Sequence, residues 1–166
     1  VHMAHKDDII HAVLVGDATE IIKLMHQLKM NTEEYEIIDI PDPVLACQAS
    51  VKLVSQNKAD ILMKGMVDTS IILHAALDKE FGMRTPNRIS HVSVMEIPTY
   101  HKLLLMSDGA MNIAPDVEIK QEIIENGVTI AHALGIKMPS VGCIAAVEKV
   151  NPKMQSKSQS NLINEN

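Results

Sequence analysis

Short β-type runs alternate along this chain with segments of helical length, and this alternation limits the possible folds more than any other feature. The run 11–15 (HAVLV) is followed by the turn residues Gly16 and Asp17, and the segment 18–29 then places apolar residues at helical spacing. A second strand is predicted at 36–40. Strands that alternate with helices are typical of an α/β fold with a largely parallel sheet.

The alternation continues as far as residue 79. A helix is predicted to begin at Pro43, because proline at a first helical position loses no hydrogen bond. The apolar run 60–67 (DILMKGMV) is typical of a buried strand. Asp68 and the two hydroxyl residues after it are suited to cap a helix that runs through Lys79.

The pattern changes after residue 89. Strand-like runs at 89–97 and 102–106 are joined only by the segment Pro98 to His101, which allows an antiparallel hairpin but no helical crossover. A second α/β lobe, or a switch in sheet topology, is therefore predicted to begin near residue 95.

One long helix and one strand are predicted in the rest of the chain. Asp116 begins the helix, which ends at about Leu134 before Gly135, and the run 140–147 is the last strand. The end of the chain is polar and simple in composition, as in a tail or a cut end. The predicted divisions are a first lobe at 1–95, a second lobe at 96–152 and a tail at 153–166.

Composition excludes several classes of protein. The 21 acidic and 15 basic residues give a net charge of −6, and no basic block is present, which argues against a nucleic-acid partner. No apolar run approaches the roughly 18 residues that a membrane span requires. Cys47 and Cys143 form no metal or disulfide pattern, and the first residues do not resemble a signal peptide, so a cytoplasmic location is expected.

The segment from Lys64 to Ser70 joins a predicted strand to a helix start through Gly65. Backbone N–H groups, hydroxyls, the positive helix end and the lysine ammonium can converge there on an anion such as phosphate. An ordinary capped turn is compatible with the same residues. Neither GxxxxGK[ST] nor GxGxxG is present.

Two further polar segments are candidates for binding. The segment 107–116 again joins a strand to a helix, and ligands of open α/β sheets bind beyond the carboxyl ends of strands, so it is predicted to share a cleft with the Lys64 segment. Arg88 is either a phosphate ligand or a surface residue. His91 and His101 fit solvent-facing positions better than a metal pair, because no carboxylate stands at ligand spacing, and no metal site is predicted.

Covalent catalysis is not indicated. Cys47 is expected in the middle of a helix and Cys143 in the middle of a strand, both among apolar neighbours, which favours inert core thiols. No serine lies in a G-x-S-x-G motif.

These segments, in this order, resemble the phosphate acetyl/butyryltransferase family, and most of all its phosphate butyryltransferase branch. The resemblance implies two lobes of the isocitrate/isopropylmalate dehydrogenase type, with three α/β layers and a mostly parallel sheet. It also implies a dimer or larger homo-oligomer. The matching blocks are AVLVGD at 12–17, ADILMKGMVDTSIILHAAL at 59–77, NRISHVSV at 87–94, PTYHKLLLMSDGAMNIAPD at 98–116 and AAVEKVNPKM at 145–154.

The reaction that the resemblance implies moves a short acyl group from coenzyme A to inorganic phosphate. Acyl-CoA and phosphate are then the substrates, they react directly in a ternary complex, and no tightly bound cofactor is expected. Relatives have Ser-Gly where this chain has Lys64-Gly65. The residues predicted to bind substrate are Lys64, Gly65, Thr69, Arg88, Asn112 and Pro115.

Members of the family extend further than this chain, which the resemblance therefore implies to be incomplete at both ends. The Ser-Arg pair and the aspartate assigned to catalysis lie in later residues of the family, so the catalytic residues are not identified here. A fragment that binds coenzyme A or phosphate without turnover is the alternative. An NAD-dependent decarboxylating dehydrogenase is a weaker one, because its metal-binding aspartates are not evident. Four methionines, Met63, Met66, Met95 and Met111, either line an acyl pocket or pack in the core.

Overall fold

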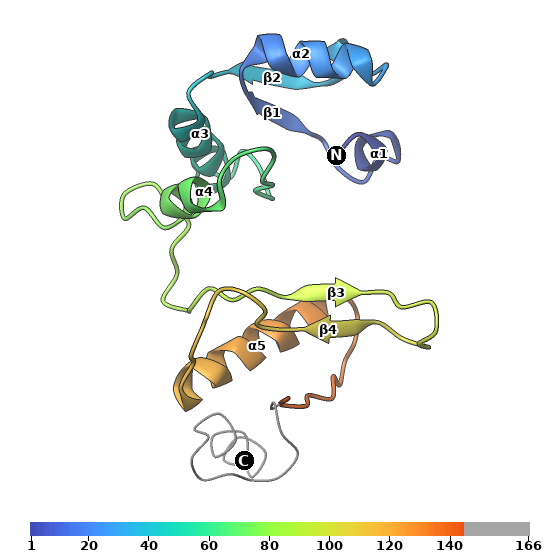
Figure 1. The fold of residues 1–166 in the computed structure, drawn as a ribbon, viewed down its shortest axis with the longest axis vertical. Helices are drawn as coiled ribbons and strands as arrows, with labels where there is room; N and C mark the ends of the chain where they lie inside the picture. The colour runs from blue at the N-terminus through green and yellow to red at the C-terminus, as the bar shows by residue number, and fades with distance from the viewer. Residues whose placement is uncertain (145–166) are drawn as a thin grey trace. The chain divides into compact units, whose positions relative to one another are not determined.

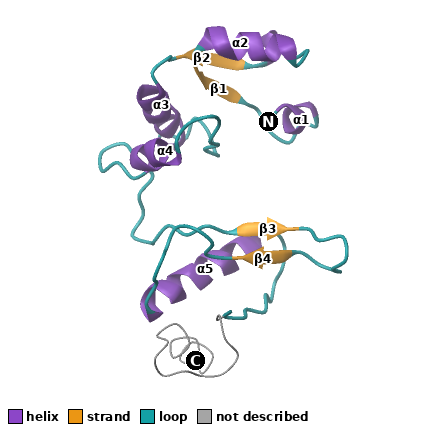
Figure 2. Ribbon diagram, in the orientation of Figure 1, coloured by secondary structure: helices purple, strands orange, loops and turns teal. Residues whose placement is uncertain are grey.

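The computed structural model describes residues 1–144 and divides into two compact units, Val1–Arg84 and a unit that begins at Thr85. Figures 1 and 2 show the elements of each unit. The lobe division near residue 95, which the change in strand spacing indicates, stays a prediction.

The first unit is built on two parallel strands that a helix connects. β1 (Val13–Gly16) and β2 (Glu36–Asp39) pair in parallel with Gly16 opposite Asp39, and α2 (Ala18–Gln27) links them (Figure 2). This β-α-β arrangement confirms the predicted order and the parallel pairing. The other elements of the unit are α1 (His2–Lys6), the 3-10 turn η1 (Thr32–Glu34), α3 (Pro43–Ser55) and α4 (Thr69–Ala76).

Aspartates cap three helices of this unit. The carboxylates of Asp17, Asp42 and Asp68 accept hydrogen bonds from backbone amides two or three positions along the chain, at the starts of α2, α3 and α4. Such caps satisfy amides that have no partner within the helix. Pro43 occupies the start of α3. All three helix starts agree with the sequence prediction.

The predicted strand at 60–67 does not form. In the sheets of the described residues β1 pairs only with β2, so this segment has no neighbouring strand. It follows an irregular course, and Leu62 and Val67 pack against the core. An apolar run predicts burial, but a strand also needs a partner for its backbone hydrogen bonds.

Helix α4 ends at Ala76, before the predicted end at Lys79. The carboxylate of Asp78 accepts hydrogen bonds from the amides of Glu80 and Phe81. Aspartate side chains that bond to nearby amides in this way compete with further helical turns. The early end of the helix therefore has a local cause.

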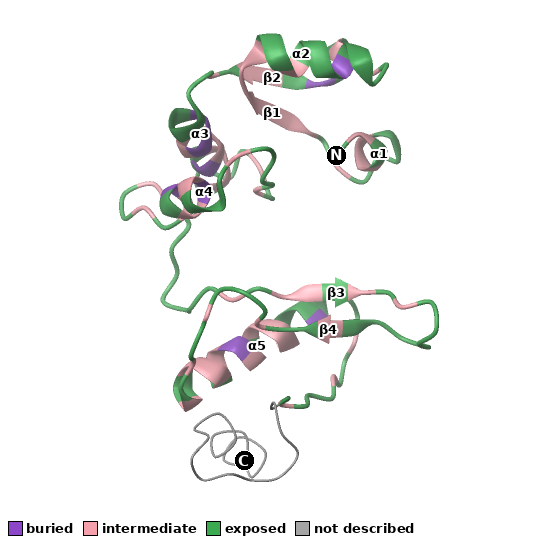
Figure 3. Cartoon of the chain, in the orientation of Figure 1, coloured by how far each residue is buried: buried purple, intermediate pink, exposed green. Residues whose placement is uncertain are grey.

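The core of the first unit lies where α3 packs against α4 (Figure 3). Cys47 and Val51 of α3 form a buried cluster with Ile72 and Ala75 of α4, and Val51 is fully buried. These residues recur at intervals of three or four, which places them on one face of each helix. The prediction that Cys47 is a core thiol is confirmed.

The second unit holds an antiparallel hairpin beside a helix. β3 (Ser93–Met95) pairs with β4 (Leu104–Met106), which confirms the predicted hairpin with shorter strands. α5 (Val117–Ala133) is capped by Asp116. Gly135 follows the helix with a φ of +82°, a conformation that favours glycine, so the predicted helix end is also confirmed.

The described residues thus form a mixed α/β structure in which only one of the two strand pairs is parallel. The parallel pairing predicted for the first strands is confirmed at β1 and β2, and the antiparallel pair is the hairpin predicted after residue 89. Residues 140–144 form no strand because they pair with no neighbour, and Cys143 is half-buried instead of lying in a strand of the core. The rest of the predicted strand at 140–147 and the predicted tail lie outside the described residues.

Candidate functional site

A pocket of about 240 Å³ lies at the carboxyl ends of β1 and β2. Gly16 at the end of β1 and Asp17 after it line one side, and Ile40 after β2 lines another. The start of α3 and residues between Met63 and Val67 complete the wall. Ligands of open α/β folds bind at this edge of the sheet. The pocket therefore lies where the alternating pattern predicts a binding site.

The predicted anion-binding segment runs along this pocket. Gly65 is one of the lining residues, and the Lys64 side chain turns back over its own segment. Its Nζ donates to the carbonyl oxygen of Gly65 at 3.3 Å and to that of Val67 at 2.8 Å. An ammonium group has three N–H donors, so these two bonds leave a third. The structure places Gly65 in the wall of the pocket and turns the Lys64 side chain onto its own segment, and the binding of phosphate by either residue stays a prediction.

Thr69, the first residue of α4, follows the capping residue Asp68. The Asp68 carboxylate accepts hydrogen bonds from the Ser70 hydroxyl at 2.7 Å and the Ser70 amide at 2.8 Å. These bonds, together with the nearby charge of Lys64, lower the pKa of Asp68. The turn is thus a capped helix start, which was one of the two interpretations of the sequence. Because Asp68 repels anions, Lys64 is the group that favours an anion here.

Asp108 organises the segment 107–116 in the second unit. Its carboxylate accepts hydrogen bonds from the backbone amides of Ala110, Met111 and Asn112 at 3.0–3.1 Å, and from the Asn112 side-chain amide. Burial raises the pKa of Asp108, but the hydrogen bonds outweigh this effect and lower the pKa to about 2. The carboxylate is therefore ionised at neutral pH, and its hydrogen bonds stabilise the conformation of the loop.

Asn112 and Pro115 shape the same loop. The Asn112 Nδ2 donates to the backbone oxygen of Ile89 at 3.1 Å, in addition to its bond with Asp108. Pro115 is half-buried directly before Asp116, the cap of α5. The Asn112 side-chain amide bonds to Ile89 and Asp108 within the protein. Its first role in this structure is therefore to hold the loop in place.

Arg88 lies in the segment that passes along α5. Its backbone amide donates to Glu122 Oε2 at 3.0 Å, and its carbonyl oxygen accepts from Asn126 Nδ2 at 2.9 Å. The Arg88 residue is exposed. Its backbone is therefore fixed while its side chain faces solvent. Sequence reasoning missed Glu122 and Asn126, since a single polar residue on a helix gives no recognisable pattern.

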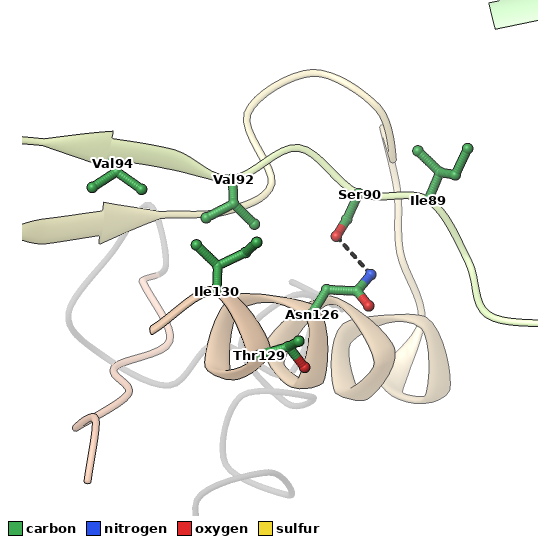
Figure 4. Close-up of a pocket in the computed structure, with 7 residues that line it drawn as sticks. All are labelled: Ile89, Ser90, Val92, Val94, Asn126, Thr129 and Ile130. Carbon is green, nitrogen blue, oxygen red and sulfur yellow. Dashed lines mark hydrogen bonds between the residues drawn. The ribbon is translucent and has the colours of Figure 1, made fainter. Parts of the chain in front are cut away.

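A second pocket, of about 570 Å³, lies between this segment and α5. Figure 4 shows Val92, Val94 and Ile130 around it, together with the hydrogen bond from Asn126 Nδ2 to Ser90 Oγ at 2.9 Å. The lining is mainly apolar. None of the residues predicted to bind substrate lines it.

The predicted site residues thus divide between the units. In the first unit, Gly65 lines the pocket of the parallel strands, while Lys64 precedes it in the chain and Thr69 begins α4. In the second, Asn112 is connected to the residue after Arg88 by its bond to Ile89. A shared cleft stays a prediction.

Other candidate groups have simpler roles. His91 and His101 are exposed, as predicted. Burial raises the pKa of the Cys47 thiol, which disfavours the nucleophilic thiolate. Within residues 1–144, no cluster of three or more His, Cys, Asp or Glu residues is placed to hold a metal ion, and no helix has the length and apolar character to cross a membrane.

Two of the four methionines that the sequence singled out, Met63 and Met66, are not packed in the core, and a role of the methionines in an acyl pocket stays a prediction. Met63 and Met66 are exposed side chains that line the pocket at β1 and β2, so they are not core residues of this unit. Their exposure follows from the irregular course of residues 60–67, which a strand would have placed inside a sheet.

A family model described as phosphate acetyl/butaryl transferase matches residues 43–163. The match includes α3, α4, the Lys64 segment and the loop around Asp108. The chain belongs to this family. It is 42% identical over 156 residues to the phosphate butyryltransferase of Clostridium acetobutylicum and 43% identical over 153 residues to that of Clostridium beijerinckii, with 94% and 92% of the chain covered. Proteins with these names are acyltransferases, and the family resemblance inferred from the sequence motifs is confirmed.

A solved structure agrees with this assignment. The branched-chain phosphotransacylase from Enterococcus faecalis V583 matches with a TM-score of 0.76 and 30% identity, covering 93% of this chain and 62% of that chain. The chain spans about half the length of the two clostridial relatives, 52% and 51%. What the whole enzymes of the phosphate acetyl/butaryl transferase family do is therefore carried to this chain only as a proposal.

Proposed function

We propose that this chain is part of a phosphate acyltransferase of the butyryl type, which moves a butyryl or similar short acyl group from coenzyme A to inorganic phosphate. A phosphate oxygen attacks the thioester carbonyl carbon, the carbon–sulfur bond breaks, and the thiolate takes up a proton. The products are an acyl phosphate and free coenzyme A. Such direct transfer needs no nucleophile from the protein, which agrees with the raised pKa of the Cys47 thiol.

The observation that carries this proposal is that Gly65 lines the pocket at the ends of β1 and β2, with Lys64 next to it in the chain. We assign the third N–H of the Lys64 ammonium to an oxygen of phosphate or of acyl phosphate. Gly65 lacks a side chain, and a Cβ placed there meets no atom within 4 Å, so the space beside it is open for a ligand. The Thr69 hydroxyl at the start of α4 is the third proposed contact.

In the second unit, Arg88 is proposed to bind substrate phosphate through its exposed guanidinium, which suits phosphate geometry. Asn112 and Pro115 are proposed to support substrate binding by holding the loop 107–116. The isocitrate/isopropylmalate dehydrogenase-like fold, a homo-oligomeric assembly, a cytoplasmic location and the absence of a tightly bound cofactor are further proposals, which rest on the family resemblance.

A second candidate function is binding of coenzyme A or phosphate without turnover. The Lys64 ammonium and the open space beside Gly65 can bind an anion whether or not acyl transfer follows. This candidate predicts that either ligand raises the unfolding temperature of the chain, while no thiol is released from butyryl-CoA.

The role of Lys64 is tested by Lys64→Ala in the active protein, with Lys58→Ala as the control at another exposed lysine. Loss of a hydrogen bond from a charged donor is expected to raise the KM for phosphate by about tenfold or more. Lys58→Ala is expected to leave that KM unchanged. An unchanged KM in Lys64→Ala would remove Lys64 from the site.

A further inference from the structure

We propose that Met66 makes phosphate binding at Lys64 sensitive to oxidation. Hydrogen peroxide converts the Met66 thioether to a sulfoxide, and the sulfoxide oxygen then competes with phosphate for the Lys64 ammonium. The oxidation follows from the exposure of Met66, whereas its effect on phosphate binding rests on the proposed function.

Exposure distinguishes Met66 from most other methionines of the chain. Met66 and Met138 are the two most exposed methionines of residues 1–144, with relative exposures of 108% and 90%, whereas Met25 is 3% exposed. A Cβ built on the neighbouring Gly65 meets no atom within 4 Å, so the chain around Met66 is open as well. A peroxide must reach the sulfur atom, and exposed methionines are therefore oxidised first.

Met66 lies in the turn that the Lys64 side chain closes. Lys64 Nζ donates to the carbonyl oxygen of Gly65 at 3.3 Å and to that of Val67 at 2.8 Å. These two residues directly precede and follow Met66 in the chain, so the ammonium is held beside the Met66 backbone. A methionine side chain is unbranched and has three rotatable bonds. Its oxidised end is therefore within reach of the third N–H of Lys64.

The oxidation itself needs only the sulfur atom and the peroxide. A lone pair of the sulfur attacks one peroxide oxygen, so that a sulfur–oxygen bond forms and the oxygen–oxygen bond breaks. The hydroxide that leaves takes up the proton of the transferred hydroxyl group and departs as water. The sulfur is oxidised, the peroxide is reduced, and an apolar side chain becomes polar.

The sulfoxide changes the competition for the Lys64 ammonium. A thioether is a weak hydrogen-bond acceptor, which leaves the third N–H for the phosphate oxygen that the proposed function assigns to it. A sulfoxide oxygen is a stronger acceptor, and it belongs to the same turn, whereas phosphate must come from solution. The nearby Asp68 carboxylate is negatively charged and offers phosphate no compensating attraction. Oxidation of Met66 is therefore expected to weaken phosphate binding.

The first test follows the formation of sulfoxide at each methionine by peptide mass spectrometry while the chain is treated with hydrogen peroxide. Met66 and Met138 are expected to oxidise roughly 30 times as fast as Met25, in proportion to their exposure. Met25 reports whether the fold stays intact during the treatment. Oxidation of Met66 no faster than that of Met25 would overturn the proposal at its first step.

The second test is calorimetric titration with inorganic phosphate before and after mild peroxide treatment. The proteins are the parent, Met66→Leu and the control Met138→Leu, which removes an equally accessible sulfur from the second unit. Oxidation is expected to weaken phosphate binding by about tenfold in the parent and in Met138→Leu, because a hydrogen bond from a charged donor is lost. Met66→Leu is expected to bind phosphate equally well before and after the treatment.

The outcomes separate the redox effect from the proposed function. If the parent binds phosphate equally well with Met66 fully oxidised, the redox effect is refuted while the assignment of phosphate to Lys64 stands. If Met66→Leu is weakened by peroxide as much as the parent, another methionine is responsible and the proposal is wrong. If the untreated parent binds no phosphate, the assignment of phosphate to Lys64 fails and the redox effect fails with it.

Discussion

Replacing Asp108 by Asn removes the charge around which the loop 107–116 is folded. One oxygen acceptor is kept, while the other becomes an amide that faces the two donors of Asn112. The pKa of Asp108 is about 2, compared with an ordinary value of 3.8. That gap corresponds to ~2.4 kcal/mol. Solvent screening at this half-buried carboxylate lowers the expected loss of local stability to about 1–2 kcal/mol.

Amide hydrogen exchange at residues 110–112, measured by NMR at pH 6, is the direct assay, because all three backbone amides donate to the Asp108 carboxylate. A loss of 1–2 kcal/mol is expected to speed exchange by about 5–30-fold. Asp60→Asn removes the same charge at an exposed position of the first unit and is expected to leave these rates unchanged. Equal rates in the parent and in Asp108→Asn would refute the assigned role of the carboxylate.

Lowering the pH is expected to protonate the Asp108 carboxylate and so to weaken the same loop. Since the pKa of Asp108 is lower in the folded protein than its ordinary value, its stabilising contribution is present above about pH 4 and is lost as the pH falls toward 2. The loop of the parent should therefore open over this range more steeply than that of Asp108→Asn. A parent and a variant with the same pH profile would contradict this explanation.

Two further predictions concern glycine and capping residues of the helices and are measured by urea denaturation followed by circular dichroism. Gly127→Ala inside α5, where a Cβ meets no atom within 4 Å, should stabilise the protein by about 0.5–1 kcal/mol. Gly135→Ala should destabilise it by about 1 kcal/mol because Gly135 has a positive φ. If both variants change the free energy of unfolding in the same direction, these roles of the two glycines are wrong. Asp68→Ala should cost about 1 kcal/mol by removing the cap of α4, and a cost no larger than that of Asp60→Ala would count against the cap.

The sequence predicted the β1-α2-β2 unit because its boundaries are marked by local chemistry. Asp17 and Asp42 cap helices through bonds to residues close by in the chain, so the residues themselves locate the helix starts. The strand predicted at 60–67 depended instead on a distant partner. The apolar pattern reports that residues such as Leu62 and Val67 are partly buried, but it does not report whether a neighbouring strand is present.

The candidate site also divides into residues that a local pattern predicts and residues that only long-range contacts reveal. Lys64 and Gly65 could be predicted as candidates because they lie near the end of an apolar run that leads into a helix cap, a position that the sequence shows directly. Glu122 and Asn126 were missed because each bonds to the backbone of Arg88, 34 and 38 residues away. Contacts of that range depend on how α5 packs, which no local pattern records.

Release of free thiol from butyryl-CoA, with and without inorganic phosphate, tests the proposed acyl transfer most directly. It is measured on this chain and on a form extended to the length of the clostridial relatives. We expect the extended form to release thiol only when phosphate is present, with formation of butyryl phosphate. Thiol release that does not depend on phosphate, or no release by the extended form, would contradict the proposal that this chain belongs to a working phosphate acyltransferase.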